Sequence, residues 1–412
     1  MRAGAAAGAG PGTITPVVTG LGVAAPNGLG AEAFWEATVQ GRSGIARITR
    51  FDPAQYPARL AGEVKDFRPA EHLPSRLVPQ TDHMTRLALV AAQEALADSG
   101  ADLSALDELE LGVVTAAGSG GFEFAHRELE KLWSKGPEHV SAYQSFAWFY
   151  AVNSGQISIR HNLRGPSGVL VTDQAGGLDA LAQARRQFRK GAALVVTGGV
   201  DGSLCPWGWV AQLTTGHVST AEDPGAAFLP FSGQAHGFVP GEGGAILVLE
   251  REPRPGRRPY GRVAGYAATF DPKPGAGRPP GLSRAIELAL TDAGVRPGEV
   301  DVVFADAAGV PELDSSEAAA LRAVFGPRGV PVTAPKTMTG RLYSGGAALD
   351  LATALLSIKH DLVPPTVNVA EPLEEYALDL VTEARSTRVD TALVLARGHG
   401  GFNAAVVLRA PG

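Results

Sequence analysis

Residues 169–177 read Val-Leu-Val-Thr-Asp-Gln-Ala-Gly-Gly, and this stretch decides the fold class. The apolar run Gly168–Thr172 is typical of a buried strand, and it leads directly into Gly177–Arg189, an Ala-rich and Leu-containing stretch that favours a helix. A residue at such a junction lies at a helix N-terminus, where free N–H groups favour an anion or oxyanion. A nucleophile would be well placed here, but the residue is Gln174, and an amide cannot act as one.

The same alternation continues outward from this stretch, from Val17 to the end of the chain, and it predicts an α/β fold. Further buried strands are expected at Leu111–Thr115, Ala193–Thr197, Ala245–Leu249 and Ala404–Leu408. Further helices are expected at Met84–Asp98, Ser283–Ala293 and Ser315–Phe325.

The chain divides at residues 251–260, REPRPGRRPY, where Arg and Pro occur without periodicity and predict a surface connection. A new strand-like run, Gly261–Phe270, follows it. We therefore expect two α/β halves, residues 17–250 and residues 251–412. Residues 1–16 are expected to form a disordered tail, because AAAGAG lacks the bulky apolar segment of a signal peptide.

Composition excludes several classes of protein. Of the 412 residues, 45% are hydrophobic and 19% are charged, so the chain can bury a large core. The formal net charge of −6 argues against a nucleic-acid-binding protein. A single cysteine, Cys205, excludes an internal disulfide and a cysteine-based metal cluster. Because no long run is free of charges and turn formers, no membrane span is expected, and the features predict a cytoplasmic protein.

The motif Gly20-Leu-Gly22-Val-Ala-Ala25 fits the loose dinucleotide-binding pattern G-x-G-x-x-A. Pro26 occupies a place where a helix should already be running, and no second strand that ends in an acid follows about 20 residues on. A tight turn after the strand Val17–Thr19 is therefore the preferred interpretation.

The motif Ala117-Gly-Ser119-Gly-Gly121 resembles a nucleophile elbow with Ala at its first position. Acidic residues and His399 follow it in the order that a hydrolase needs, so a Ser119 hydrolase stays open as an alternative. Cys205 has no neighbouring His in the sequence, and a lone thiol of this kind is typical of a small buried hydrophobe.

Longer motifs are distributed along the chain. They are VVTGLGVAAPNGLG, SGGFEF, LWSKGPEHVSAYQSFAWFYAVNSGQISIRH, TDQAGGLDAL, PWGWV, FVPGEGGAILVLE, KTMTG and GHGGFNAAV. Over nearly the full length, from Val17 to Leu408, the chain resembles a β-ketoacyl synthase of the thiolase superfamily. It most closely resembles the ketosynthase-β subunit, or chain length factor, of aromatic type II polyketide synthases. The resemblance implies a thiolase-like fold of five α-β-α-β-α layers built from two similar halves.

The resemblance implies a site without its catalytic residues. Active relatives use a Cys-His-His set, in which Cys carries the acyl chain and the two His residues assist malonyl decarboxylation. These positions fall on Gln174, Ala308 and Arg341, and only Lys336 matches the active pattern. Without a thiolate there is no acyl-enzyme, and a permanent guanidinium cation cannot cycle a proton at neutral pH. No catalytic residue and no condensation by the chain alone are therefore expected.

The resemblance also implies a tunnel. Phe122, Ala125 and Leu129 share one helix face by their spacing, which by itself is typical of an ordinary core stripe. In chain length factors these positions, together with Phe146 and Trp207, line an amphipathic tunnel at the interface with the catalytic subunit. Because Ala125 and Leu129 leave the tunnel wider than Phe would, we expect a decaketide product, with a dodecaketide as the second choice.

The implied function is that of a non-condensing subunit in an acyltransferase complex of antibiotic biosynthesis. The chain would form a heterodimer, or a dimer of heterodimers, with a ketosynthase-α subunit and set the polyketide length. An acyl carrier protein would bring malonyl units on its own phosphopantetheine, so no cofactor, metal, nucleic acid or membrane is expected on this chain. The alternatives are a malonyl-acyl carrier protein decarboxylase that uses Gln174 and the Ser119 hydrolase.

Overall fold

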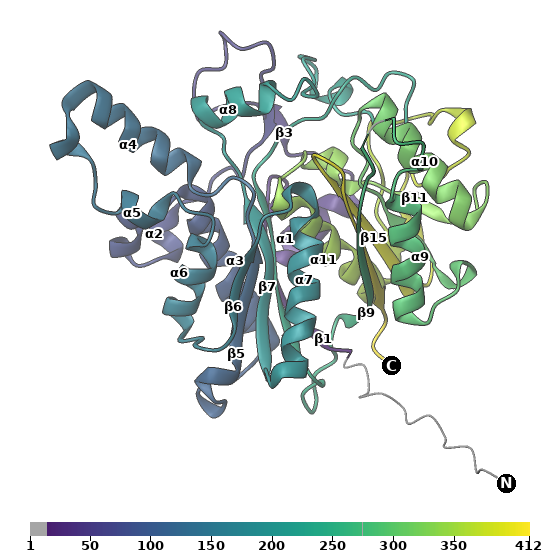
Figure 1. Ribbon diagram of the computed structural model, residues 1–412, viewed down its shortest axis with the longest axis horizontal. Helices are drawn as coiled ribbons and strands as arrows, with labels where there is room; N and C mark the ends of the chain where they lie inside the picture. The colour runs from purple at the N-terminus through teal and green to yellow at the C-terminus, as the bar shows by residue number, and fades with distance from the viewer. Residues whose placement is uncertain (1–14, 274) are drawn as a thin grey trace.

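A computed structural model describes residues 15–273 and 275–412 (Figure 1). The expected disordered tail, residues 1–16, lies outside the described residues except for its last two positions. The main sheet contains β1 (Val17–Ala25), β2 (Gly28–Leu29), β5 (Leu111–Ala116), β6 (Ser167–Leu170), β7 (Leu194–Asp201), β8 (Gly243–Glu250), β9 (Gly261–Phe270), β10 (Val302–Phe304), β11 (Pro331–Thr333), β13 (Asp379–Leu380), β15 (Thr391–Gly398) and β16 (Phe402–Arg409). Two short ribbons pair β3 (Ile45–Arg47) with β4 (Leu60–Gly62) and β12 (Leu362–Val363) with β14 (Arg385–Ser386).

The helices surround and separate the strands. They are α1 (Ala31–Val39), α2 (Pro69–His72), α3 (His83–Ser99), α4 (Phe122–Lys135), α5 (Gln144–Ala147), α6 (Val152–His161), α7 (Gly176–Gln187), α8 (Pro206–Leu213), α9 (Leu282–Ala293), α10 (Pro311–Phe325) and α11 (Ser344–His360). None of the helices in the described ranges is long and apolar enough to cross a bilayer.

The two halves of the main sheet repeat one topology. In the first half β1 is antiparallel to β8, β8 is antiparallel to β7, and β7, β5 and β6 are parallel neighbours. In the second half β9, β16, β15, β10 and β11 follow the same order with the same directions. The halves join where β1 pairs with β9 at Val17 and Val18. This repetition is the arrangement of two similar halves that the resemblance predicted.

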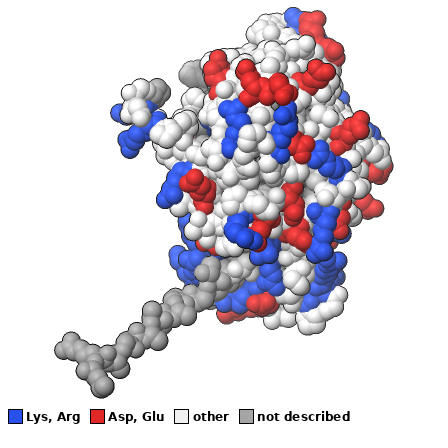
Figure 2. Space-filling view, turned by 90° about the vertical axis from the view of Figure 1, so that its right-hand side faces the viewer, with Lys and Arg blue, Asp and Glu red and all other residues white. Residues whose placement is uncertain are grey.

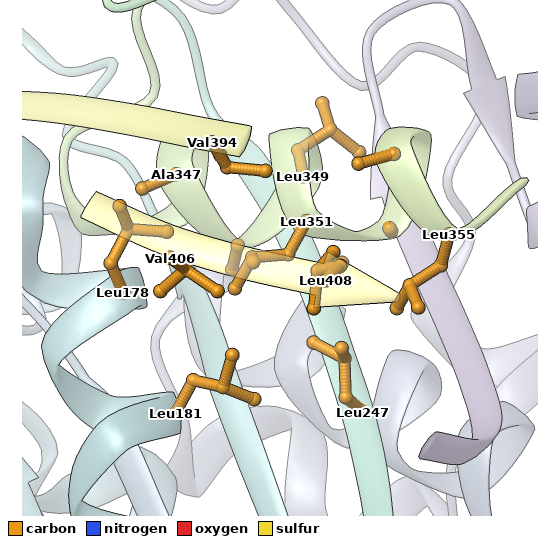
Figure 3. Close-up of a cluster of buried hydrophobic side chains, with 14 of the residues drawn as sticks. Leu178, Leu181, Leu247, Ala347, Leu349, Leu351, Leu355, Val394, Val406 and Leu408 are labelled. Atoms are coloured by element: carbon orange, nitrogen blue, oxygen red, sulfur yellow. The ribbon is translucent and has the colours of Figure 1, made fainter. Parts of the chain in front are cut away.

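Three buried apolar clusters fill the spaces between the layers. In the largest, α7 and α11 lie between the two half-sheets, and Leu181 and Leu351 meet Leu247 and Val406 of the strands (Figure 3). A second cluster packs α3 and α6 on the outer face of the first half-sheet. A third packs α9 and α10 on the outer face of the second half-sheet. The predicted five-layer α-β-α-β-α fold is therefore confirmed.

The turn expected at Gly20–Ala25 is wrong, because these residues continue strand β1. A Cβ atom at Gly20 would lie 2.0 Å from the carbonyl oxygen of Ala95, and one at Gly22 would lie 1.9 Å from that of Ala91. The glycines therefore allow helix α3 to pack directly on the strand, which any larger residue would prevent. The chain turns only after Ala25, at the two residues that separate β1 from β2.

Candidate functional site

Gln174 lies at the junction of β6 and α7, in a short 3₁₀ turn at Asp173–Ala175. Asp173 has a φ of 51°, a left-handed conformation that non-glycine residues adopt only where neighbours hold them. The Ser344 hydroxyl donates to the Asp173 carbonyl at 2.9 Å, and the Asp173 carboxylate accepts the His399 N–H at 2.7 Å. The turn that presents Gln174 is thus held by α11 and by the loop after β15.

A cavity of about 230 Å³ opens at this junction. Its wall contains Gln174, Ala308 and Arg341, so the structure brings together the three positions that the resemblance assigned to the lost catalytic set. Two imidazoles, His217 and His399, also line the cavity, and both residues are exposed. Neither lies at a predicted catalytic position, and the cavity wall contains no thiol.

Arg341 is buried in the cavity wall, with 7% of its surface exposed. It forms a bidentate ion pair with Asp306, in which Nη1 lies 3.1 Å from Oδ2 and Nη2 lies 3.0 Å from Oδ1. Nη1 also donates to the Asp306 carbonyl at 2.9 Å, and Nη2 donates to the Arg397 carbonyl at 3.3 Å. Most of the guanidinium donors are therefore already used inside the protein.

Asp306 is a site residue that the sequence analysis missed. Burial by itself would raise the pKa of its carboxyl, but the charges of Arg341 and Lys336 and the hydrogen bonds from Arg341 hold that pKa below its ordinary value. The carboxylate also accepts the Arg397 N–H at 2.9 Å. Its signal in the sequence is weak, since it is only an acid that follows a buried strand by two residues.

Lys336 is the one residue that matches the active-site pattern of the family, and it faces the interior behind the cavity. Its ammonium donates to the carbonyls of Ala305 and Asp306 at 2.5 and 3.0 Å, and it pairs with the Asp350 carboxylate at 2.8 Å. Burial raises the pKa of Asp350 although Lys336 opposes this effect. The lysine is thus part of a buried network that joins α11 to the residues after β10.

Ser119 is buried, and its hydroxyl donates to the Asp201 carboxylate. Asp201 also accepts the backbone N–H groups of Gly118, at 2.5 Å, and of Ser344, at 3.3 Å. His399 lies beside Asp173 in the wall of the cavity at Gln174, which Ser119 does not line, and in the described part of the chain no imidazole is hydrogen-bonded to Ser119. The Asp201 carboxylate therefore connects its own strand to the segments that contain Ser119 and Ser344. This structural role of Ser119 does not favour the hydrolase.

Cys205 begins helix α8, and its sulfur accepts the Gly208 N–H at 3.5 Å. Burial raises the pKa of the thiol to about 11. A thiol of this kind stays protonated at neutral pH and is unreactive.

Phe122 and Trp207, two of the five predicted tunnel residues, stack with their ring centroids 4.4 Å apart. Ala125 is buried and Leu129 is half-buried on the same helix, α4, whereas Phe146 and Trp207 are 36% and 43% exposed. None of the five lines the cavity at Gln174. They form a separate, partly open apolar surface, and their role as a tunnel stays a prediction.

Large aromatic side chains are exposed beside this surface. They belong to one segment and are Tyr143, Phe146, Trp148, Phe149 and Tyr150, which we call the aromatic surface. Helices α4 and α5 project from the body on the side away from α9 and α10 (Figure 1). The opposite side mixes Lys and Arg with Asp and Glu, as a solvent-facing surface does (Figure 2). Exposed apolar groups gathered in one place mark an interaction site.

Strand β6 ends the sheet on the same half of the molecule. Ser167 is exposed, and the other three residues of the strand are half-buried. The next residue, Val171, is 48% exposed. An open strand edge of this kind can pair with another chain.

Family models and a known relative match most of the chain. The family models described as beta-ketoacyl synthase N-terminal and C-terminal domain match residues 16–254 and 260–370. The tetracenomycin polyketide synthase ketoacyl synthase beta subunit of Streptomyces glaucescens is 62% identical over 402 residues, which cover 96% of this chain and 98% of that protein.

Two solved structures have a similar fold over nearly the full length of this chain. The ishigamide ketosynthase/chain length factor aligns with a TM-score of 0.85 and 28% identity, covering 97% of this chain and 100% of that one. A type II polyketide synthase acyl-carrier protein in complex with its ketosynthase bound to the hexaketide aligns with a TM-score of 0.85 and 27% identity, with the same coverage.

Proposed function

This chain belongs to the beta-ketoacyl synthase family, and from that premise we propose that it is the ketosynthase-β subunit, or chain length factor, of a type II polyketide synthase. One observation carries the proposal. The family's fold is kept, but the cavity at the junction of β6 and α7 is lined by Gln174, Ala308 and Arg341, the positions where the resemblance places the thiol and the two imidazoles of a condensing enzyme.

The chemistry of these three residues supports a non-condensing role. The Gln174 amide cannot form a thioester, and the methyl group of Ala308 donates no hydrogen bond to a developing enolate oxygen. Arg341 is a permanent cation whose donors are held by Asp306, so it cannot serve as a general acid or base. The condensation must therefore be performed by another subunit.

Two features of the surface support pairing with a ketosynthase-α subunit. The aromatic surface is exposed in the isolated chain, and the edge of β6 is open for continuation of the sheet. An obligate partner buries apolar area of this kind. In the complex, an acyl carrier protein would deliver malonyl groups on its own phosphopantetheine, and the surface of Phe122, Ala125, Leu129, Phe146 and Trp207 would limit the chain.

The test is reconstitution of the complex with a ketosynthase-α and an acyl carrier protein. We expect a 1:1 complex by sizing and mass analysis, and a polyketide of defined length. Removal of the partner's catalytic thiol should abolish product, and Gln174→Cys in this chain should not restore it, because Ala308 and Arg341 remain. Condensation by that double variant would overturn the non-condensing role.

A separate measurement addresses the decarboxylase alternative. This chain alone is incubated with malonyl-acyl carrier protein, and the release of CO2 is followed. We expect no release above the uncatalysed rate. Release that is lost in Gln174→Ala would assign the decarboxylase activity to this chain in place of a purely length-setting role.

A further inference from the structure

Tyr343 begins helix α11 in a backbone conformation that residues other than glycine rarely adopt, with a φ of 49° and a ψ of −133°. Such conformations persist where the surrounding structure holds them, and they occur at positions that serve a function. Tyr343 lies two residues after Arg341, yet its side chain does not line the cavity at Gln174. Its side chain instead contacts Ser203, in the segment before α8.

The phenol of Tyr343 holds the segment that leads into helix α8. Its oxygen forms a hydrogen bond with the hydroxyl of Ser203, which is buried in the connection that precedes α8. The Ser203 carbonyl in turn accepts the N–H of Cys205, the N-cap residue of α8, at 2.9 Å. The helix has a second anchor, because the buried Trp209 indole donates to the Ala58 carbonyl at 3.1 Å.

The residue next to Tyr343 holds the approach to α4. The Ser344 N–H donates to Asp201, and the same carboxylate accepts the Ser119 hydroxyl and the Gly118 N–H. Phe122 follows Ser119 by three residues and opens α4. The start of α11 is therefore linked to the segments that lead into both elements of the stacked pair, namely α4 with Phe122 and α8 with Trp207.

We propose that Tyr343 is a positioning residue for product length. Through Ser203 it fixes the start of α8, and so it fixes the Trp207 indole against Phe122 at the wall that stops the growing chain. Trp207 is 43% exposed, so its packing alone does not determine its position. This inference rests on the proposed function and adds to it a residue outside the predicted tunnel surface.

The test compares product lengths from reconstituted complexes. Tyr343→Phe removes only the hydroxyl, and Ser203→Ala removes its partner. The matched control is Tyr376→Phe, which also deletes a tyrosine hydroxyl, since Tyr376 donates to the Pro311 carbonyl at 3.4 Å in the other half. We expect the first two variants to raise the share of off-length products about fivefold, the population change from one lost hydrogen bond. The control should keep the wild-type distribution.

Several outcomes separate the claims. If Tyr343→Phe and Ser203→Ala keep the wild-type length distribution while Leu129→Phe shifts it, the proposed function stands and the inference is wrong. If Tyr376→Phe broadens the distribution equally, the effect is general loss of stability, which also overturns the inference. Should Tyr343→Phe fail to assemble, Ser203→Ala decides. A wild-type complex without a defined product length would contradict the proposed function itself.

Discussion

A buried arginine needs a carboxylate, and Asp306 meets this need in the cavity wall. The unpaired guanidinium of Arg341 would be costly inside the protein, because burial removes its hydration. Asp306 offers both oxygens to it and is itself held by the Arg397 N–H. At the residue scale, Arg341 and Asp306 therefore form a closed ion pair at the position where the resemblance predicts an imidazole in condensing relatives.

Arg341→Ala should destabilise the complex strongly, because it leaves the Asp306 carboxylate buried without its cation. Removal of one member of a buried pair costs about 3–5 kcal/mol. The control is Arg388→Ala, since Arg388 pairs with Asp390 at the surface with its side chain 80% exposed, where a pair contributes about 0–1 kcal/mol. Urea denaturation of both variants measures the difference, and equal midpoints would contradict the role assigned to Asp306.

A second buried acid makes the stability depend on pH. Asp314 is buried and accepts the N–H groups of Phe231 and Gly309 at 2.9 and 3.0 Å. Burial, and then the charge of Glu317, raise the pKa of Asp314 to about 7 from an ordinary value of 3.8. Between these two values the folded state binds more protons than the unfolded state, so this group lowers the stability as the pH rises through that window.

Asp314→Asn should remove this part of the pH dependence. The free energy of unfolding of the variant is expected to decline less than that of the wild type between about pH 4 and pH 7, since an amide does not titrate there. Chemical denaturation at several pH values measures it. Asp390→Asn, at a half-buried surface position, is the control and should keep the wild-type slope. Parallel pH profiles for the wild type and Asp314→Asn would show that Asp314 does not titrate in this range.

At the scale of elements, α4 is the helix whose side chains should set the product length. Leu129→Phe adds an aromatic ring and Ala125→Thr adds about two heavy atoms to a surface where even one methylene is felt. A growing chain that meets the obstruction should leave early, so shorter polyketides are expected. Product analysis of the reconstituted complex decides, with Trp133→Phe at the 83% exposed position of α4 as control. Lower output with an unchanged length distribution would mean that the two residues are ordinary core.

Most elements could be predicted from periodicity, but their ends and close contacts could not. Helix α10 begins at Pro311, four residues before the expected start at Ser315, because proline fits the first helical turn and the apolar pattern does not report it. Gly20 and Gly22 were predicted to form a turn, whereas the reason for both is the approach of α3, a contact between distant segments. Local sequence carries no signal for such contacts.

In the candidate site, too, residues with a local sequence signal could be predicted and residues defined by contacts between distant segments could not. Gln174 was found because a strand–helix junction has a local signature, and the resemblance supplied Ala308 and Arg341, which lie far away in the sequence. Asp306 and Tyr343 were missed, since a charge partner and a hydrogen bond to Ser203, in the segment before α8, exist only after the chain has folded. The sequence pattern identifies what chemistry is lost, and the structure identifies what replaces it.

At the scale of the whole molecule, the cavity at Gln174 and the open surfaces lie on one duplicated fold. The half that holds Gln174 also presents the aromatic surface and the edge of β6, whereas the face of the other half that Figure 2 shows carries Lys and Arg mixed with Asp and Glu. A subunit that does not catalyse condensation can keep this fold because the fold presents the surface that pairs with the ketosynthase-α subunit. The sheet edge is therefore where pairing can be tested most directly.

Val169→Pro should weaken the complex with ketosynthase-α and leave this subunit folded. Val113 of β5 and Ala117, just after it, donate to the carbonyls of Pro166 and Leu170. Backbone groups of successive residues in a strand point to opposite sides, so the even-numbered residues of β6 face β5 and Val169 directs its N–H to the open edge. Proline there removes an edge donor and no hydrogen bond to β5. We expect the dissociation constant to rise about tenfold, as for one lost hydrogen bond with added steric hindrance. Val169→Ala keeps the N–H and is the control, with circular dichroism as the check on folding. Wild-type affinity in a folded Val169→Pro subunit would show that the partner does not continue the sheet at β6, and pairing would then have to rest on the aromatic surface alone.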